Sequence, residues 1–278
     1  MKTLIIIYTI LFGCVKLSAQ SDSTKQKSNG LINANMLHPT DAFTAYTLNK
    51  GEWAYNQALT PYPSWAWWGI TDWLTTELDF EAWLGGVPSF NFRFALLKQK
   101  SLRPAIAYET MYQYLSKEID LLGKYKFLST KRMGNSWYNK INASWKLKEK
   151  LHLHFSTGAT YSEKLTIDNA DSLNYEGKTY NYLFSPDFSA SIDCRIKNWI
   201  SLHTTASYGS TFLYIDNVPT KQQFAFGTRI APFINNRFGF LRCFRLEATV
   251  VSFYFKAADH RVTGPIGFIY WQWDWSKN

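Results

Sequence analysis

The chain has 278 residues, of which 18% are aromatic, and a formal charge of +9, so it could form one large domain or two ordinary ones. Three cysteines are too few for an exported scaffold held together by disulfides. The basic residues are scattered among presumed turns, which disfavours nucleic acid as a partner and favours simple solvation of the turns.

The chain opens with an export signal. Lys2 precedes an apolar run over residues 4–15, and small residues follow it. This order is that of a secretory signal peptide, and the run is shorter than the about 20 residues of a membrane-spanning helix. We therefore assign residues 1–20 to a signal peptide cleaved near Ala19. Lipid attachment at Cys14 is an open alternative, because the residues before it loosely resemble a lipobox.

Residues 21–50 are mostly polar and irregular. They contain Pro39 and show no sustained hydrophobic period. We expect a periplasmic leader here, too short for a plug domain, which either stays outside the following domain or folds back into or across its mouth.

After residue 51, polar and apolar side chains alternate with a period of two. The clearest stretch follows the predicted turn at residues 69–72, where Thr75, Glu77, Asp79 and Glu81 share one face and apolar residues share the other. Successive side chains of a strand point to opposite faces. A soluble sandwich would bury the apolar face between two sheets, whereas a membrane barrel turns it to lipid and its polar face to a lumen.

The same alternation recurs to the end of the chain. It predicts strands over 89–97, 104–115, 136–147, 151–162, 180–196, 199–214, 221–234, 240–255 and 264–275, after a first region, 51–68, that holds one bent strand or two short ones. Short connections at 197–198 and 235–236 alternate with longer ones, as do the periplasmic turns and external loops of outer-membrane barrels. We predict an all-β fold over residues 51–278: a closed antiparallel transmembrane β-barrel of about twelve strands, with about ten as the alternative.

The last predicted strand alternates in aromatic residues, with Trp271, Trp273 and Trp275 near the end of the chain. With the Gly51–Trp53 start and the turn at 69–72, this pattern resembles Gram-negative outer-membrane β-barrel proteins of a porin-like or transporter-like class. The resemblance covers nearly all of the chain after the signal peptide. It implies an outer-membrane location, with the lipid bilayer and lipopolysaccharide around the barrel.

Charged residues on the polar face are predicted to line the lumen. They are Glu77, Asp79, Glu81, Arg93, Glu109, Lys140, His154, Arg195, Arg229, Arg245 and Glu247. Acidic residues gather early in the chain and basic ones late. Two interpretations are open: the two sectors oppose each other across a lumen and orient small polar solutes, or the charges pair and fill a narrow barrel.

One predicted face carries His152, His154 and Ser156. The spacing of His154 and Ser156 resembles the His-x-Ser pair of outer-membrane phospholipase A, with Asn169 as a candidate third member. The match departs at residues 157–158, where that enzyme has Asn-Gly, and the pair points inward instead of toward lipid. A metal site at the two histidines lacks an evident third ligand. We therefore predict no catalytic residue, no metal and no cofactor.

These patterns predict a channel or porin-like protein for small polar solutes, without enzymatic activity. Two alternatives stay open. The first is a non-conducting envelope scaffold that contacts partner proteins of the envelope through residues 21–49 and 164–178. The second is a lipid hydrolase that uses Ser156 and His154.

Overall fold

The computed structural model describes residues 44–59, 64–84, 88–100, 103–120, 129–148, 150–168, 178–209, 220–255 and 260–275. The predicted signal peptide and most of the predicted leader lie outside these residues. Twelve strands make up the fold. They are β1 (Trp53–Ala58), β2 (Trp65–Thr71), β3 (Leu74–Asp79), β4 (Ser89–Leu97), β5 (Ala105–Asp120), β6 (Ser129–Lys148), β7 (Leu151–Asp168), β8 (Lys178–Lys197), β9 (Ile200–Gly209), β10 (Thr220–Ile230), β11 (Phe244–Phe255) and β12 (His260–Trp275).

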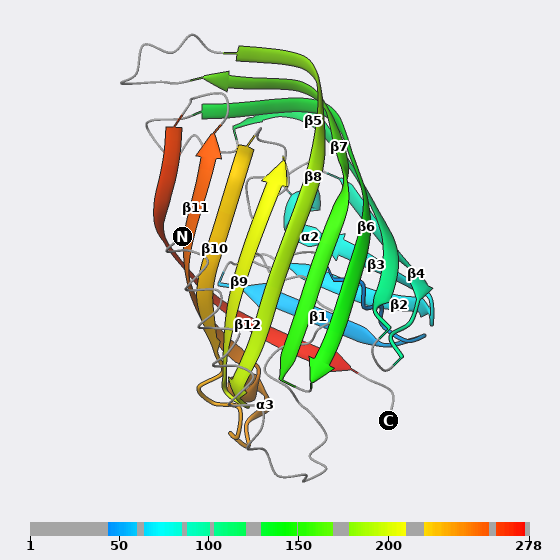
Figure 1. Ribbon diagram of the computed structural model, residues 1–278, viewed down its shortest axis with the longest axis vertical. Coiled ribbons are helices and arrows are strands. Elements are labelled where there is room, and N and C mark those ends of the chain that lie inside the picture. The colour runs from blue at the N-terminus through cyan, green and yellow to red at the C-terminus, as the bar shows by residue number, and fades with distance from the viewer. Residues whose placement is uncertain are drawn as a thin grey trace.

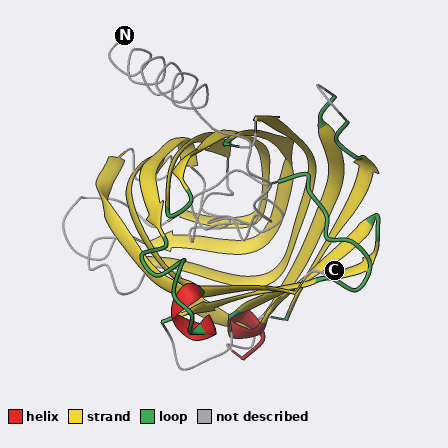
Figure 2. Cartoon of the chain, turned by 90° about the horizontal axis from the view of Figure 1, so that it is seen from below, coloured by secondary structure: helices red, strands yellow, loops and turns green. Residues whose placement is uncertain are grey.

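Each strand pairs antiparallel with its neighbours in the chain, and β1 pairs with β12 to close the barrel (Figure 1). The closing ladder runs from Trp53 opposite Trp275 to Ala58 opposite Tyr270. Seen end-on, the strands form one continuous ring with the short helices at one side of it (Figure 2). A closed ring leaves no strand edge with unpaired backbone groups. The predicted closed barrel of twelve antiparallel strands is confirmed, and residues 51–68 contribute two of them.

The two faces of the wall differ as the alternation predicts. On β6, the side chains of Tyr138, Lys140 and Asn142 are buried, whereas Trp137 and Ile141 on the opposite face of the strand are exposed. The same pattern holds along β4, where Asn91 and Arg93 are buried next to outward-facing phenylalanines. The barrel therefore carries its polar side chains inside and its apolar side chains outside.

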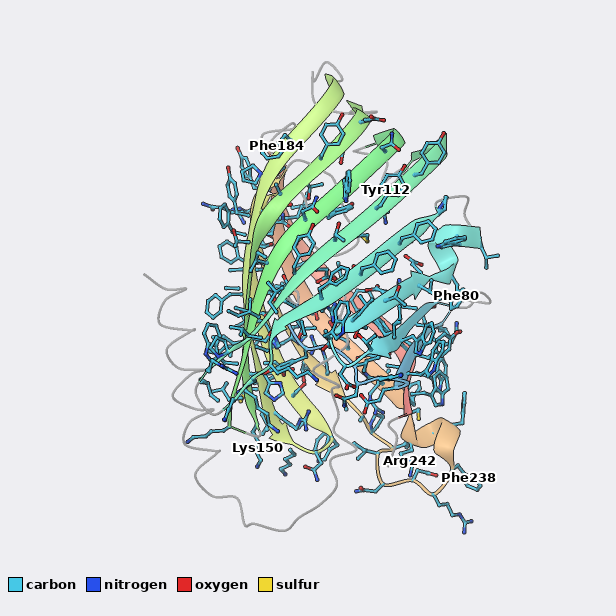
Figure 3. All side chains as sticks on the ribbon, turned by 90° about the vertical axis from the view of Figure 1, so that its right-hand side faces the viewer. Phe80, Tyr112, Lys150, Phe184, Phe238 and Arg242 are labelled. Carbon is cyan, nitrogen blue, oxygen red and sulfur yellow. The ribbon has the colours of Figure 1, made fainter. Side chains whose placement is uncertain are left out.

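Outward-facing aromatic residues gather at two levels of the wall. At the level of the β2–β3 turn, Trp53 and Trp68 stack with ring centroids 5.1 Å apart. At the opposite end, Trp83 meets Phe90 edge-to-face with ring centroids 5.0 Å apart, and Tyr112 there contacts a neighbouring tryptophan. Figure 3 shows Tyr112 and Phe184 near this end, and Lys150 and Phe238 at the other. Two such levels correspond to the aromatic girdles of a membrane barrel.

Strands β5 to β8 are longer than predicted. Their pairing continues beyond the rest of the barrel, with Ile119 opposite Arg132 and Ser129 opposite Asp168 (Figure 1). Residues 116–120 and 129–135 therefore belong to strands, where the sequence indicated a longer polar stretch with room for a strand extension at 124–128, which lies outside the described residues. The polar composition of these stretches concealed their strand character, because a strand that extends beyond the lipid-facing band needs no apolar face.

Two short helices replace predicted strand. β3 ends at Asp79, and α2 (Phe80–Leu84) follows it, so the expectation that Glu81 continues the acidic face of a strand is wrong. The ladder between β3 and β4 extends only to Glu77, and the Trp83 indole N–H donates to the Ser89 carbonyl at 2.8 Å where the chain turns back. The helix α3 (Gly239–Arg242) lies between β10 and β11, where the sequence indicated a tight turn and the start of a strand.

No helix in the described part of the chain is long and apolar enough to cross a membrane.

A charge placed on the outer face tests whether this face contacts hydrocarbon. Ile141 lies on β6 between the outward residues Trp137 and Trp145, and it is exposed. We expect Ile141→Arg to lower the free energy of unfolding by about 2–4 kcal/mol in phospholipid vesicles, measured by urea titration. Leu147→Arg, near the end of the strand, is the control and should cost about 1 kcal/mol or less. Equal effects at the two positions would contradict a membrane-spanning wall.

Candidate functional site inside the barrel

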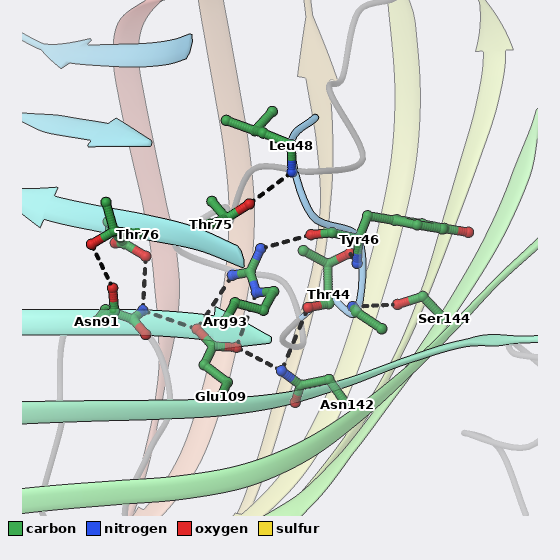
Figure 4. Close-up of polar contacts among 12 residues, drawn as sticks. Thr44, Tyr46, Leu48, Thr75, Thr76, Asn91, Arg93, Glu109, Asn142 and Ser144 are labelled. Carbon is green, nitrogen blue, oxygen red and sulfur yellow. Dashed lines mark hydrogen bonds and ion pairs between the residues drawn. The ribbon is translucent and has the colours of Figure 1, made fainter. Parts of the chain in front are cut away.

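Residues 44–50, called the inner segment below, lie inside the barrel against the interior faces of several strands (Figure 4). The structure thus places the end of the predicted leader in the interior of the barrel. Thr44, Ala45 and Leu48 are buried, and the chain leaves this position to enter β1 at Trp53. The inner segment lies toward the end of the barrel that carries the β2–β3 and β6–β7 turns, called the short-turn end below.

Polar side chains of the wall hydrogen-bond to the backbone of the inner segment. Three backbone N–H groups donate outward: Ala45 to Ser144 Oγ at 2.8 Å, Leu48 to Thr75 Oγ1 at 2.8 Å, and Lys50 to Asp72 Oδ1 at 2.9 Å. Two carbonyls accept: that of Tyr46 from Arg93 Nη1 at 3.0 Å, and that of Thr44 from Asn142 Nδ2 at 3.5 Å. A buried backbone needs partners for these groups, and wall side chains supply them here in place of a neighbouring strand.

Apolar contacts hold the inner segment as well. Leu48 packs against Ala54 and Trp67, and the half-buried Trp65 covers this cluster. Burying a leucine side chain of this kind contributes about 1.5–3 kcal/mol. Polar residues no longer occupy the inward positions where the inner segment passes. Trp67 is inward there and packs against Leu48 of the inner segment instead of facing water.

Gly69 of β2 makes room for the inner segment. A Cβ atom at this position would overlap the Asn49 carbonyl oxygen and crowd the backbone of Leu48. The Gly69 carbonyl accepts the Gly51 N–H at 2.7 Å, and its own N–H donates to the Glu52 carbonyl at 2.9 Å. The close approach of two backbones is a reason for glycine in a strand.

Glu109 of β5 is the centre of the polar contacts beneath the inner segment. Its carboxylate accepts hydrogen bonds from Arg93 at 3.3 Å, from Asn91 at 2.9 Å and from Asn142 at 2.6 Å. Arg93 in turn donates to the inner segment, so a charge pair inside the wall connects directly to the bound chain. We call these residues the Glu109 cluster.

A second charged group, the Arg229 cluster, lies on β8 to β11. Arg229 forms ion pairs with Glu247 at 3.2 Å and with Asp193 at 3.5 Å. His203 Nε2 lies 3.6 Å from Glu247 Oε1, and Thr249 donates to the same carboxylate oxygen at 2.9 Å. Arg229 is only 1% exposed, so one guanidinium meets two carboxylates away from bulk water.

Most of the predicted lumen residues lie on the interior face. Arg93, Glu109, Lys140, His154, Arg229, Arg245 and Glu247 are buried, Glu77, Asp79 and Arg195 are half-buried, and Glu81 belongs to α2. The ion pairs of the two clusters join strands that are neighbours or one strand apart, instead of opposing across the barrel as two sectors. Of the two interpretations, paired charges are the one that these clusters show.

Sequence reasoning missed part of the site. Asp193 and His203 were not among the predicted lumen residues, although each is inward and buried. Asp193 alternates with Ser191 on β8, which is a signal that periodicity alone could have found. The inner segment offered no such signal, because it has no strand period and its partners come from distant strands.

His154 does not pair with Ser156. Its Nδ1 hydrogen-bonds to Ser144 Oγ at 2.8 Å, across the β6–β7 ladder, and the Tyr46 ring covers it edge-on with ring centroids 6.1 Å apart. Ser156 forms no hydrogen bond with His154 among the described residues, and Asn169 lies outside them. Within that part of the chain, no cluster of three or more potential ligands could hold a metal ion.

Tyr46 also ties the inner segment to the rim of the barrel. Its hydroxyl donates to Gln99 Oε1 at 2.7 Å, and Gln99 Nε2 donates to the Lys146 carbonyl at 2.9 Å. Burial raises the pKa of the Tyr46 phenol, so the hydroxyl keeps its proton and remains a donor at neutral pH.

The chain folds as a closed barrel that is apolar outside and polar inside, which is the architecture of outer-membrane β-barrel proteins. No protein-family model matches the sequence. No curated protein matches it either.

Three solved structures are similar to the chain at low identity. The toluene transporter TodX of Pseudomonas putida is 9% identical over 91% of this chain and 99% of that one, with a TM-score of 0.32. The translocator domain of the autotransporter NalP from Neisseria meningitidis is 9% identical over 80% and 85%, with a TM-score of 0.31. A TodX mutant described as a monoaromatic hydrocarbon channel is 8% identical over 83% and 91%, with a TM-score of 0.33.

Substitution of Gly69 tests the seat of the inner segment. We expect Gly69→Ala to displace residues 47–49, because the added methyl group overlaps their backbone. In a Thr47→Cys background, a water-soluble maleimide should then modify the introduced thiol several-fold faster, with the label located by peptide mass. Gly267→Ala is the control, because a Cβ atom there would lie 3.7 Å from the Glu247 carbonyl oxygen, an ordinary van der Waals contact. Unchanged labelling in Gly69→Ala would refute the close approach.

Removal of the Arg229 guanidinium tests the second cluster. Arg229→Met leaves Glu247 and Asp193 buried without their shared cation, and we expect a loss of about 3–5 kcal/mol in unfolding free energy. Arg261→Met, on the outer surface, should change it by about 0.5 kcal/mol or less. Adding Glu247→Gln to Arg229→Met should restore part of the loss, as urea titration would measure. A loss in Arg229→Met no larger than that in Arg261→Met would show that the pairs contribute little.

Proposed function

We propose that the protein is an outer-membrane channel for small polar solutes, in which the inner segment forms the narrowest part at the short-turn end. The observation that carries this proposal is how the inner segment is held. It is not a strand of the sheet, and wall side chains bind its backbone through separate hydrogen bonds. A chain held in this way can shift without opening the barrel wall.

The chemistry of the interior supports a polar solute. The wall presents amides, hydroxyls and carboxylates, and its charges are paired over short distances in both clusters. Paired charges leave many hydrogen-bonding groups but little net field. Such a surface suits uncharged or zwitterionic solutes better than a strongly charged ion.

Lipid hydrolysis has less support from the same residues. The hydroxyl bound to His154 belongs to Ser144, which also accepts the Ala45 N–H, and Tyr46 covers the histidine. A nucleophile must reach its substrate, and this hydroxyl lies beneath the inner segment, inside the wall, away from the lipid. The alternative function is a scaffold that binds envelope partners, and the absence of any solute passage would favour it.

Conductance in planar bilayers tests the channel. Thr75→Ala/Ser144→Ala removes two acceptors for the backbone of the inner segment, and we expect its single-channel conductance to exceed that of the wild type by a factor of about two or more, because two hydrogen bonds worth about 1 kcal/mol each are lost. The control is Ser191→Ala/Thr205→Ala, which makes the same changes on β8 and β9, two strands that supply none of the hydrogen bonds to the inner segment described above. If wild type and both variants all conduct no better than a protein-free membrane, the channel proposal fails.

A further inference from the structure

Basic residues gather at the short-turn end of the barrel. Exposed lysines and arginines lie on or beside nearly every connection there: Lys50, Lys98, Lys100, Arg103, Lys146, Lys148, Lys197, Arg237 and Arg242. Among the residues whose side chains the structure describes, the acids of this rim are Glu52 and Asp72, and each accepts a backbone N–H of the inner segment. Figure 3 shows Lys150 and Arg242 at the same end of the molecule. This rim therefore carries a strong excess of positive charge.

Nine exposed cations at this rim stand against two acids that are both engaged by the inner segment. Solubility is served by charges of both signs, so it does not require an excess of one sign. The excess at the short-turn end therefore indicates an anionic partner.

The connection between β10 and β11 adds exposed aromatic residues to the basic rim. Phe238 is 58% exposed and Phe240 is 59% exposed, and the Arg237 guanidinium lies 5.2 Å from the Phe238 ring centroid. Phe240 stacks on Trp271, an outward residue of β12, with ring centroids 5.1 Å apart. The connection thus continues the aromatic level of the outer wall, where a bilayer surface would lie.

A cavity of about 560 Å³ opens beside this connection. Trp199, Ile230 and residues 232–236 line it. Its lining is mixed: Trp199, Ile230, Phe233 and Ile234 supply apolar surface, Asn235 and Asn236 supply amides, and Arg237 follows directly in the chain. An open cavity of this mixed lining at a membrane surface, next to a cation, fits a molecule with an acyl chain and an anionic headgroup.

We propose that the short-turn rim binds anionic phospholipid, with its tightest site between Trp199 and Arg242. The headgroup phosphate lies near Arg237 and Arg242, and the upper part of an acyl chain lies in the cavity against Trp199 and Phe233. The basic residues of the other turns attract further anionic headgroups around the rim. A basic residue near an anionic membrane surface contributes about 1 kcal/mol, which corresponds to about fivefold in affinity. The proposal requires a membrane-embedded barrel, but it does not depend on solute passage.

Native mass spectrometry of the full protein tests this site. The protein is titrated in an uncharged detergent with phosphatidylglycerol or phosphatidylcholine, and the affinity of the first lipid bound is compared. We expect wild type to prefer phosphatidylglycerol, and Arg237→Gln/Arg242→Gln to lose roughly fivefold of that affinity for each charge removed. Both arginines are exposed, so the variant should fold, and its mobility on an unheated gel checks this.

Arg261→Gln is the matched control. Arg261 is also exposed and lies over an aromatic ring, at 5.9 Å from the Tyr254 centroid, but on the strand pair at the opposite end. A preference that survives in Arg261→Gln and disappears in Arg237→Gln/Arg242→Gln supports the site. Equal affinities for the two lipids in wild type, or equal losses in the two variants, would overturn it. Binding of polyglutamate without any lipid preference would assign the rim to an acidic protein and overturn it as well.

Discussion

Pairing of β1 with β12 is the constraint on which the rest of the structure depends. A strand exposed to hydrocarbon has no water to satisfy its N–H and C=O groups, so the sheet must close on itself. Closure here joins the first strand after the inner segment to the last strand of the fold, through the ladder from Trp53 to Ala58. It separates an outer face that must be apolar from an inner face that is free to carry charge.

The enclosed interior has its own requirement. A charge removed from water destabilises the fold unless it has a partner, and the wall meets this need with ion pairs between neighbouring strands. The Glu109 cluster does more than neutralise itself, because Arg93 extends it to the Tyr46 carbonyl. The same residues that make the interior polar thus hold a piece of chain inside it, which links the stability of the wall to the proposed control of passage.

The two ends of the barrel differ in a way that follows from its connections. Tight turns leave little room for compensating acids, and at the short-turn end the described acids serve the inner segment. The remaining lysines and arginines face outward beside the aromatic level of the wall. At the opposite end the backbone pairing of β5 to β8 extends beyond the rest of the barrel. The short-turn end therefore presents a basic rim beside the aromatic level of the outer wall.

Period-two alternation by itself determined the class of fold and the inward face, and it limited the strand number to about twelve or ten, because side-chain direction in a strand depends only on local geometry. It placed Arg93, Glu109 and Arg229 on the interior before any contact was known. It could not show that β3 stops at Asp79, nor that residues 44–50 lie within the ring. Only tertiary structure decided these points and the partner of each charge, because they depend on contacts between residues far apart in the chain, such as Ala45 with Ser144. The alternation of polar and apolar residues within one strand does not reveal such contacts.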